Sequence, residues 1–537
     1  MSDSVRAQNI RMKRDHGKHS MVRRQQPDFN YVNSIATIQN PNDAINAVLG
    51  LPGVGDSSQS WAKPENGLLN PNTDDGDSTQ VVWFSDVPFT QPPNNDGYAD
   101  GNWKSIPDYI STQALNFTLN TTFAVTDQQS SDVPGQPVVQ PFYVNQNYDP
   151  TKIKRALIVF PGKPRDSWKY ATLFSNALNA ILTKQLYNIK PEEVLIIAPA
   201  VLNTDDKDAS DSQDGSLGDN WLIYKGSNWE SGGSSKAPTL NNSITFYSML
   251  DRFATELMNQ TKYPQLKNLV FAGHSMGGQA VARYAMLKKQ TKYDGSIKYW
   301  IGNPGSWAWV SSSTDSTASD RPNPNPAEPC PDPMQRERWP YGIGNQSSIP
   351  KYARKRYTNN GLGYTDVFLN RTVHYSLGLL DNGAGSTQCE AQYQGGTHLQ
   401  RGAYFASAVG IAHGDNMLPP THNVSFIAGV SHQDYPMIAA TQSLDFLFGQ
   451  DYDKPRQDTF GIHKTRPPKT PSNSPSDGDE EEDWESSTYR TVAWVVLVVI
   501  IVILIVGFFA FDRIFKPNTL DWDRDYWEAT DAKQRLL

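Results

Sequence analysis

The sequence predicts an α/β fold in which a mostly parallel sheet is flanked by helices. Short apolar runs alternate with longer amphipathic segments, which is typical of βαβ units with fully buried strands. The apolar runs predict strands at 156–160, 194–198, 268–272, 297–301, 373–380 and 424–430. The amphipathic segments between them predict helices over 168–185, 243–260 and 276–289 and in the region near 400–409.

Changes in composition set the limits of this domain. Residues 1–105 are rich in Asn, Asp, Pro, Gly and Ser without sustained periodicity, which indicates a mostly irregular polar leader. The alternating residues 114–125 and the run 139–144 are typical of antiparallel entry strands. We therefore expect the regular domain over 106–452.

Two long insertions interrupt the alternation, at about 201–240 and 304–370. Both follow predicted strands, and so begin at the sheet edge where α/β proteins bind ligands. Their tryptophans favour a lid or a pocket wall: Trp221, Trp229, Trp307, Trp309 and Trp339.

The C-terminal part predicts a membrane anchor. Residues 453–490 are Pro/Ser-rich and then acidic, a composition typical of a flexible linker. Residues 491–511 form an uncharged apolar run that would cross a hydrocarbon core of ~30 Å as a transmembrane helix. The short tail 512–537 is too polar and too long to be the removed end of a GPI signal.

Charge and motif content exclude several classes of protein. The formal net charge of −8 argues against a nucleic-acid partner, although Arg11 to Arg24 is locally basic. The segment Gly50 to Ser57 has the glycine spacing of a phosphate loop, but Asp56 stands where that loop needs a lysine. The Asp-rich loop from Asp205 to Asp219 lacks EF-hand spacing, and no H-E-x-x-H motif or Cys/His cluster occurs. We expect neither a cofactor nor a metal.

The motif Gly273-His274-Ser275-Met276-Gly277 matches G-x-S-x-G, with a predicted strand before it and a predicted helix after it. A serine on such a turn has a strained backbone, and the flanking glycines let neighbouring chains approach. The helix start points its free amides at an oxyanion that forms on attack. Ser275 is therefore the candidate nucleophile, and the Met276 amide a candidate oxyanion donor.

A serine nucleophile needs a histidine base within hydrogen-bond reach. His432 follows the last predicted strand, which places it on a loop at the catalytic edge. The other candidates have no strand end before them, lie inside a strand or belong to the elbow itself, which favours surface or packing roles: His274, His374, His398, His413 and His422. We therefore expect His432 to be the base.

The base in turn needs a carboxylate that fixes its tautomer. Asp381 directly follows the strand VHYSLGLL and is the candidate acid, with Asp366 and Asp434 as alternatives. An Asp at the start of an Asp-Asn-Gly sequence is also a common turn residue.

A second oxyanion donor is expected after the first parallel strand. That strand runs into Phe160-Pro161-Gly162-Lys163, where an amide of Gly162 or Lys163 would join that of Met276. An ordinary Pro-Gly turn is the alternative reading of this tetrapeptide.

Over roughly 114–450 the chain resembles the α/β-hydrolase family. The segments GHSMGG, LLDN and GVSH stand where that family has its Ser-Asp-His triad, and YWIGNPGSW with CEAQYQGGTHLQRG is similar to secreted fungal-type hydrolases of this fold. The resemblance implies an esterase or lipase-like enzyme that acts on a small-molecule or lipid ester. The alternatives are a serine peptidase or acyltransferase on the same residues, or a catalytically inactive surface binding protein.

Several features bear on which side of the membrane the domain lies. Arg490 precedes the apolar run, whereas Arg513, Lys516 and Arg524 follow it, which favours a cytoplasmic tail and an extracellular or lumenal domain. We hypothesise a disulfide between Cys330 and Cys389, which needs an oxidising compartment. No apolar signal-peptide core precedes Phe29, so a tail-anchored cytosolic enzyme is the alternative. Glycosylation sequons occur at Asn116, Asn120, Asn241, Asn259, Asn345, Asn370 and Asn423.

Overall fold

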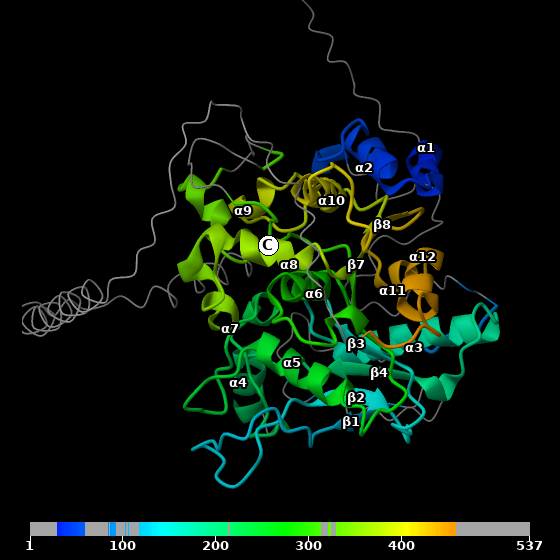
Figure 1. Cartoon of the computed structure of the whole chain (residues 1–537). Coiled ribbons are helices and arrows are strands. Elements are labelled where there is room, and N and C mark those ends of the chain that lie inside the picture. The colour runs from blue at the N-terminus through cyan, green and yellow to red at the C-terminus, as the bar shows by residue number, and fades with distance from the viewer. Residues whose placement is uncertain are drawn as a thin grey trace, which may run out of the picture. The chain divides into compact units, whose positions relative to one another are not determined.

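An eight-stranded sheet with the order β1-β2-β4-β3-β5-β6-β7-β8 forms the centre of the domain (Figure 1). The computed structural model describes residues 29–59, 84, 86–92, 103, 106, 117–212, 215–312, 321–323 and 329–457. The strands are β1 Phe117–Asn120, β2 Phe142–Asn145, β3 Arg155–Phe160, β4 Val194–Pro199, β5 Asn268–His274, β6 Ile297–Gly302, β7 Thr372–Gly378 and β8 His422–Ile427. The strands β3 to β8 pair in parallel, whereas β2 pairs antiparallel with β1 and β4. The predicted mostly parallel sheet and its antiparallel entry strands are confirmed.

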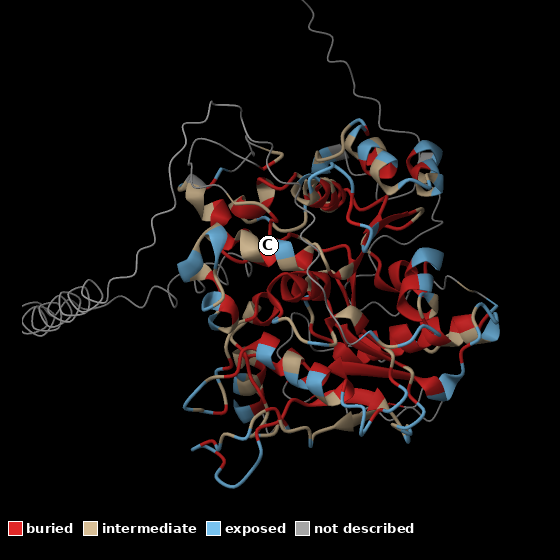
Figure 2. Ribbon diagram, in the orientation of Figure 1, coloured by how far each residue is buried: buried red, intermediate tan, exposed pale blue. Residues whose placement is uncertain are grey.

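Helices cover both faces of this sheet. The strand residues alternate between two apolar clusters: Ile158 belongs to the cluster that includes residues of α5, α6 and α10, and Val159 to the cluster that includes residues of α3, α11 and α12. Figure 2 shows the sheet buried between these layers. The main helices are α3 Ser167–Thr183, α5 Phe246–Leu257, α6 Met276–Leu287 and α10 His398–His413, close to the predicted ranges.

Shorter helices fill the connections. The α-helical ones are α1 Phe29–Ser34, α2 Pro41–Leu49, α4 Thr204–Ser212, α7 Lys351–Arg354, α8 Leu362–Phe368, α9 Cys389–Gln392, α11 Asp434–Ile438 and α12 Thr441–Leu444. Single turns of 3-10 helix occupy Ile35–Thr37, Ser57–Gln59, Pro191–Glu193, Asn228–Ser231, Asp294–Ser296, Pro333–Glu337, Gln346–Ser348 and Asn359–Gly361, and a π turn occupies Asp445–Gly449.

Residues 29–59 differ from the expected irregular leader. Asn40 caps α2 by accepting from the amides of Asn42 and Asp43, and Pro41 follows at the first helical position. The apolar face of α2, including Ile45 and Val48, is buried in the main core, where α2 packs on α10. This nine-residue helix has little stability of its own, so tertiary packing decides its formation.

The expected linker and membrane segment mostly lie beyond the described residues. Where the structure does describe this region, the chain still contacts the domain: Arg456 donates to the Met258 carbonyl and the Gln457 amide donates to Ser296. These contacts lie just beyond the predicted limit at 452. The predicted transmembrane run 491–511 is outside the described residues, and none of the helices described has the length and apolar composition needed to span a bilayer.

The tryptophans of the two insertions are mainly packing residues. Trp229, Trp307 and Trp309 are fully buried, and the ring of Trp307 stacks on Phe405 of α10 at 4.3 Å between centroids. Trp339 is also buried and donates its indole N–H to the Ser231 carbonyl, which joins the second insertion to the first. These side chains therefore form part of the core, and the lid or pocket wall stays a prediction.

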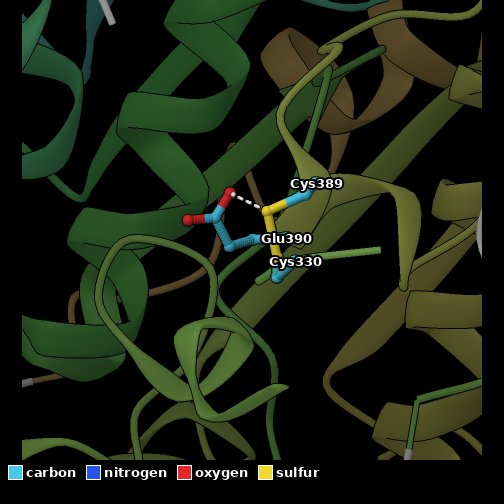
Figure 3. A group of neighbouring side chains, drawn as sticks. All are labelled: Cys330, Cys389 and Glu390. Carbon is cyan, nitrogen blue, oxygen red and sulfur yellow. Dashed lines mark hydrogen bonds between the residues drawn. A yellow bond between two sulfur atoms is a disulfide. The ribbon is translucent and has the colours of Figure 1, made fainter. Parts of the chain in front are cut away.

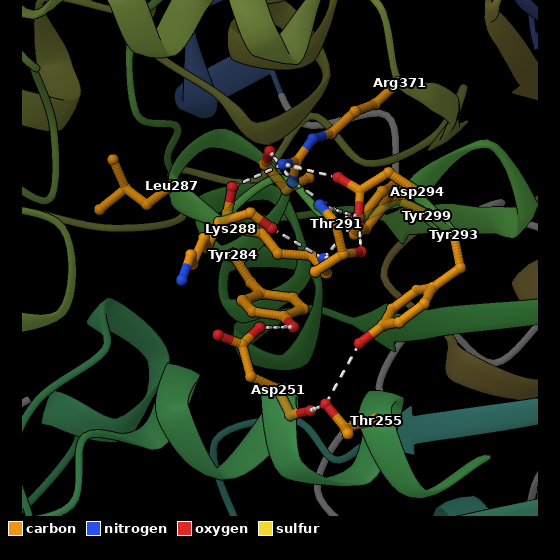
Figure 4. A network of polar contacts seen from close by, with 12 residues as sticks. Asp251, Thr255, Tyr284, Leu287, Lys288, Thr291, Tyr293, Asp294, Tyr299 and Arg371 are labelled. Atoms are coloured by element: carbon orange, nitrogen blue, oxygen red, sulfur yellow. Dashed lines mark hydrogen bonds and ion pairs between the residues drawn. The ribbon is translucent and has the colours of Figure 1, made fainter. Parts of the chain in front are cut away.

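A buried polar network fixes the C-terminal end of α6 (Figure 4). Lys288 and Arg371 both contact the buried carboxylate of Asp294, at 2.7 and 3.4 Å. Arg371 also donates to the carbonyls of Ala285 and Lys288, which satisfies main-chain acceptors at the helix end. The network joins α6 to the starts of β6 and β7, and so sets the position of the helix that begins beside Ser275.

We predict that Asp294→Ala destabilises the fold strongly, because it leaves two buried cations without their carboxylate. The free energy of unfolding should fall by about 3–5 kcal/mol, as measured by urea denaturation. A matched control is Lys262→Ala, which removes an exposed ion pair with Glu256 and should cost less than about 1 kcal/mol. Equal losses in the two variants would contradict this role of the network.

Candidate active site

Ser275 occupies a strained turn between β5 and α6. Its backbone angles are φ 56° and ψ −121°, a conformation that a residue with a side chain rarely adopts. The Ser275 amide donates to the Gly302 carbonyl at the end of β6, 2.8 Å away, which holds the turn against the next strand. The predicted strand, turn and helix around this serine are therefore present.

The glycines of the motif allow this turn to pack closely. A Cβ on Gly277 would come within 2.6 Å of the carbonyl oxygens of Phe160 and Pro161, and one on Gly273 within 2.3 Å of the Gly277 backbone. Real Cβ atoms do not approach backbone this closely, so only glycine fits at either position. The packing also brings the end of β3 next to the serine.

The structure brings Ser275, His432 and Asp381 together. His432 Nε2 lies 2.9 Å from Ser275 Oγ, and His432 Nδ1 lies 2.8 Å from Asp381 Oδ2. His432 follows β8 and Asp381 follows β7, so both lie at the carboxyl edge of the sheet. The three side chains form a continuous path along which a proton can pass from the serine to the imidazole.

Burial and charge act in opposite directions on Asp381. Burial alone raises the pKa of a carboxyl group, but the imidazoles of His398 and His432 contact this one, and the net effect is a pKa well below the ordinary value. Asp381 is therefore ionised near neutral pH. A carboxylate in this state stabilises an imidazolium beside it.

The alternative acids lie elsewhere. The buried carboxylate of Asp434 pairs with Lys169 of α3 at 2.8 Å, and this ion pair joins the start of α11, just after His432, to α3. Asp366 is exposed on α8.

Apart from His398, the other histidines that the structure describes have packing or surface partners. His374 is buried on β7, where desolvation lowers its pKa to about 3, and His422 contacts the Tyr375 hydroxyl and the Phe368 carbonyl. His413 contacts Asp415 at the C-terminal end of α10. His274 is buried beside the Tyr170 hydroxyl, and burial holds its pKa well below the ordinary value.

His398 lies at the site, although the sequence favours a surface or packing role for it because no predicted strand ends directly before it. It is the first residue of α10, its Nδ1 lies 3.1 Å from Asp381 Oδ1, and its ring stacks on that of His432 at 4.4 Å between centroids. A usable signal exists in the sequence, because a helix that follows a parallel strand begins at the same edge where that strand ends. The first turn of α10 therefore had to lie near Asp381.

The loop after β3 lies next to Ser275, as expected for an oxyanion donor. A Cβ on Gly162 would lie 3.8 Å from the Ser275 Cβ, whereas the Lys163 side chain is exposed. Met276 is the first residue of α6, and the first amides of a helix have no acceptor within the helix. The first insertion supports this loop through the buried ion pair of Arg165 with Asp206, at 2.8 Å.

The N-terminal segment 53–56 forms hydrogen bonds with the turn that follows Asp381. Asn382 donates to the carbonyls of Gly53 and Asp56 and accepts from the Gly55 amide. Gln400 of α10 donates to the Val54 carbonyl in the same region. The glycine-rich segment that has phosphate-loop spacing therefore binds the protein's own acid loop.

A disulfide joins the second insertion to this part of the site (Figure 3). Cys330 and Cys389 are bonded, with 5.1 Å between their Cα atoms. Cys389 lies between Asp381 and His398 in the sequence, so the bond restrains the segment that carries both side chains. The pairing is the one hypothesised from the sequence.

Two groups of side chains in the described part of the chain have metal-ligand chemistry. In the first, Cys330 and Cys389 lie beside Glu390, but a disulfide has no thiolate to offer. In the second, Asp381, His398 and His432 place one donor atom each within 4.8 Å of one another. Both imidazoles direct Nδ1 toward the carboxylate, so these nitrogen and oxygen atoms already contact one another. The absence of a metal stays a prediction.

No family model matches the chain, and no curated protein matches its sequence. Among solved structures it is similar to a poly(3-hydroxybutyrate) depolymerase from Bordetella parapertussis, with a TM-score of 0.39, 16% identity and coverage of 62% of this chain and 88% of that one. It is also similar to poly(aspartic acid) hydrolase-1 from Sphingomonas sp. KT-1, with a TM-score of 0.38, 16% identity and coverage of 61% and 97%. A siderophore hydrolase from Aspergillus nidulans gives a TM-score of 0.31 at 11% identity, with coverage of 66% and 98%.

We predict that the disulfide contributes substantially to stability. It closes a segment with a sequence separation of 59, for which the chain-entropy model gives about 4 kcal/mol. Cys330→Ser combined with Cys389→Ser should therefore lower the midpoint of thermal unfolding, and dithiothreitol should do the same to the unmodified protein. An unchanged midpoint in both experiments would contradict the prediction.

Proposed function

We propose that this chain, which has the α/β-hydrolase fold, is a serine hydrolase that cleaves a carboxylic ester through an acyl-enzyme on Ser275. The observation that carries the proposal is the contact path from Ser275 through His432 to Asp381, with distances of 2.9 and 2.8 Å. Ser275 also has the backbone geometry of a nucleophile elbow.

In the proposed reaction His432 Nε2 takes the proton of Ser275 Oγ as that oxygen bonds to the ester carbonyl carbon. Asp381 holds the other ring proton and stabilises the imidazolium. The tetrahedral intermediate then collapses, the carbon–oxygen bond of the ester breaks, and His432 gives its proton to the leaving alcohol. Water, deprotonated by His432, attacks the acyl-enzyme, and the carboxylic acid leaves as Ser275 regains its proton.

The developing oxyanion would be held by main-chain amides. We assign this role to Met276 at the start of α6 and to Gly162 or Lys163 after β3. The position of Gly162 beside Ser275 supports the assignment. Removing one donor from such a site typically costs about 10²–10³ in rate.

Three other functions are possible outcomes of the experiments. A serine peptidase or an acyltransferase would use the same residues with an amide substrate or a second alcohol as acceptor. A catalytically inactive binding protein would keep the fold without reacting at Ser275. The strain retained at Ser275 favours a reactive site, since strained conformations cluster where they serve a function.

We also propose that residues 491–511 anchor the enzyme to a membrane, with the domain on the extracellular or lumenal side. The disulfide supports an oxidising compartment. The sequon residues Asn241, Asn259 and Asn423 are exposed, so a glycan could attach to them. The ester substrate would then be a lipid or a small molecule outside the cytosol.

We predict that a fluorophosphonate probe labels the wild type and not Ser275→Ala, because the probe reacts only with an activated serine. Asp381→Asn should lower kcat by about 10³–10⁴, since the base then loses its correct tautomer. The control is Asp366→Asn, which changes an exposed carboxylate on α8 and should leave kcat unaltered. Labelling of Ser275→Ala at the wild-type rate would rule out this nucleophile.

The same enzyme should gain activity as the pH rises and His432 loses its proton. Only neutral His432 can accept the serine proton, whereas Asp381 is already ionised because its pKa is lowered.

Turnover of acyl esters of increasing chain length, of an anilide and of an ester with added hydroxylamine would then separate esterase, peptidase and transferase chemistry.

For the membrane proposal, we predict that added protease leaves the domain intact in sealed vesicles in which the lumenal side is enclosed. Endoglycosidase should also increase the electrophoretic mobility of the protein. Digestion of the domain in sealed vesicles together with unchanged mobility would instead indicate a cytosolic, tail-anchored enzyme.

A further inference from the structure

The carboxylate of Asp381 contacts two imidazoles. Its Oδ2 contacts His432 Nδ1 at 2.8 Å, and its Oδ1 lies 3.1 Å from His398 Nδ1. The first contact has good hydrogen-bond geometry; the second is at ion-pair distance and less well directed. The minimal triad needs only one imidazole on the carboxylate, so the second has no role in the reaction described above.

The ring of His398 also covers one face of His432. The two rings stack with an interplanar angle of 29°. His398 also meets the backbone of Gly385, where a Cβ would come within 2.8 Å of Nε2. Gly385 has φ +64°, so glycine is favoured there for conformation and for space. His398 is therefore in contact with both the base and a main-chain turn.

Main-chain bonds link the same elements. The His398 amide donates to the Gly383 carbonyl and the Leu399 amide to the Asp381 carbonyl, both at 3.0 Å. Thr397 caps the start of α10 by accepting from the Gln400 amide. The first turn of α10 and the acid loop thus form one bonded unit, and the His398 side chain is built into it.

We propose that His398 is a positioning residue, which holds the Asp381 carboxylate and the His432 ring in the arrangement that serves Ser275. The inference rests on the proposed hydrolase function and adds a residue to it. With each carboxylate oxygen facing one imidazole, rotation of the Asp381 side chain would break both contacts. The stacked ring similarly restrains His432 from turning away from Ser275 Oγ.

The charge state of His398 suits this role. The groups that face it are Asp381 after β7, His432 after β8, His274 at the end of β5 and Arg401 on its own helix. Burial lowers the pKa of His398 more than Asp381 raises it, so the ring is neutral near pH 7. A neutral neighbour does not repel the imidazolium that forms on His432, whereas a second cation would.

The test compares His398→Asn, His398→Gln and His398→Ala in the full-length protein. An asparagine amide can occupy the position of Nδ1, whereas the glutamine amide reaches the position of Nε2, so only asparagine keeps a donor toward Asp381. We expect kcat for ester hydrolysis to fall about 10–100-fold in the alanine and glutamine variants, with KM little changed, and to recover in part with asparagine. A donor to Asp381 also offsets part of its negative charge, and without that donor the carboxylate stabilises the protonated form of His432 more strongly. The acid limb of the pH profile should therefore move to higher pH with alanine and glutamine but not with asparagine.

His422→Asn is the matched control, because it changes another buried histidine. His422 lies at the amino end of β8, away from the carboxyl ends of the strands where the site lies. Its kcat per folded molecule should equal that of the wild type. Wild-type kcat in all three His398 variants, or equal loss in all three without a shift of the pH profile, would overturn the positioning role. Failure of the wild type to react with fluorophosphonate or esters would instead overturn the proposed function, so the two failures are distinguishable.

Discussion

The close approach of backbone to backbone at Gly277 is the constraint on which the site depends. This residue lies against the carbonyl oxygens of Phe160 and Pro161, and no side chain fits between them. The contact places the start of α6 beside the end of β3, and with it the Met276 amide near the loop of Gly162. The strained backbone of Ser275 follows from the same packing, because the chain must turn from strand to helix within this space.

A strained turn persists only when its surroundings over-determine it. At its far end, α6 is fixed by the buried carboxylate of Asp294, which accepts from Lys288 and contacts Arg371. At its near end, the Ser275 amide bonds to the last residue of β6. The helix is thus restrained at both ends, and the buried charges act on the geometry of the site although they lie away from the reacting atoms.

The acid loop is restrained by segments from distant parts of the chain. Residues 53–56 bind Asn382, and the disulfide ties the second insertion to Cys389. The first turn of α10 adds both a main-chain bond to the Asp381 carbonyl and the imidazole of His398. A carboxylate that orients a base must itself be held in place, and in this chain three separate connections restrain the Asp381 loop.

The sequence by itself determined the local features of this protein. The apolar runs of β3 to β8 predict their burial, and the glycines that flank Ser275 predict its turn, because each feature depends on residues a few positions apart. The preference for Asp381 and His432 also followed, since both come just after predicted strands. Only the tertiary structure decided that α2 packs on α10 and that residues 53–56 bind Asn382. These contacts join segments far apart in the sequence, with a separation of 329 residues between Asn382 and Gly53, and no local pattern encodes which distant surface a segment will meet.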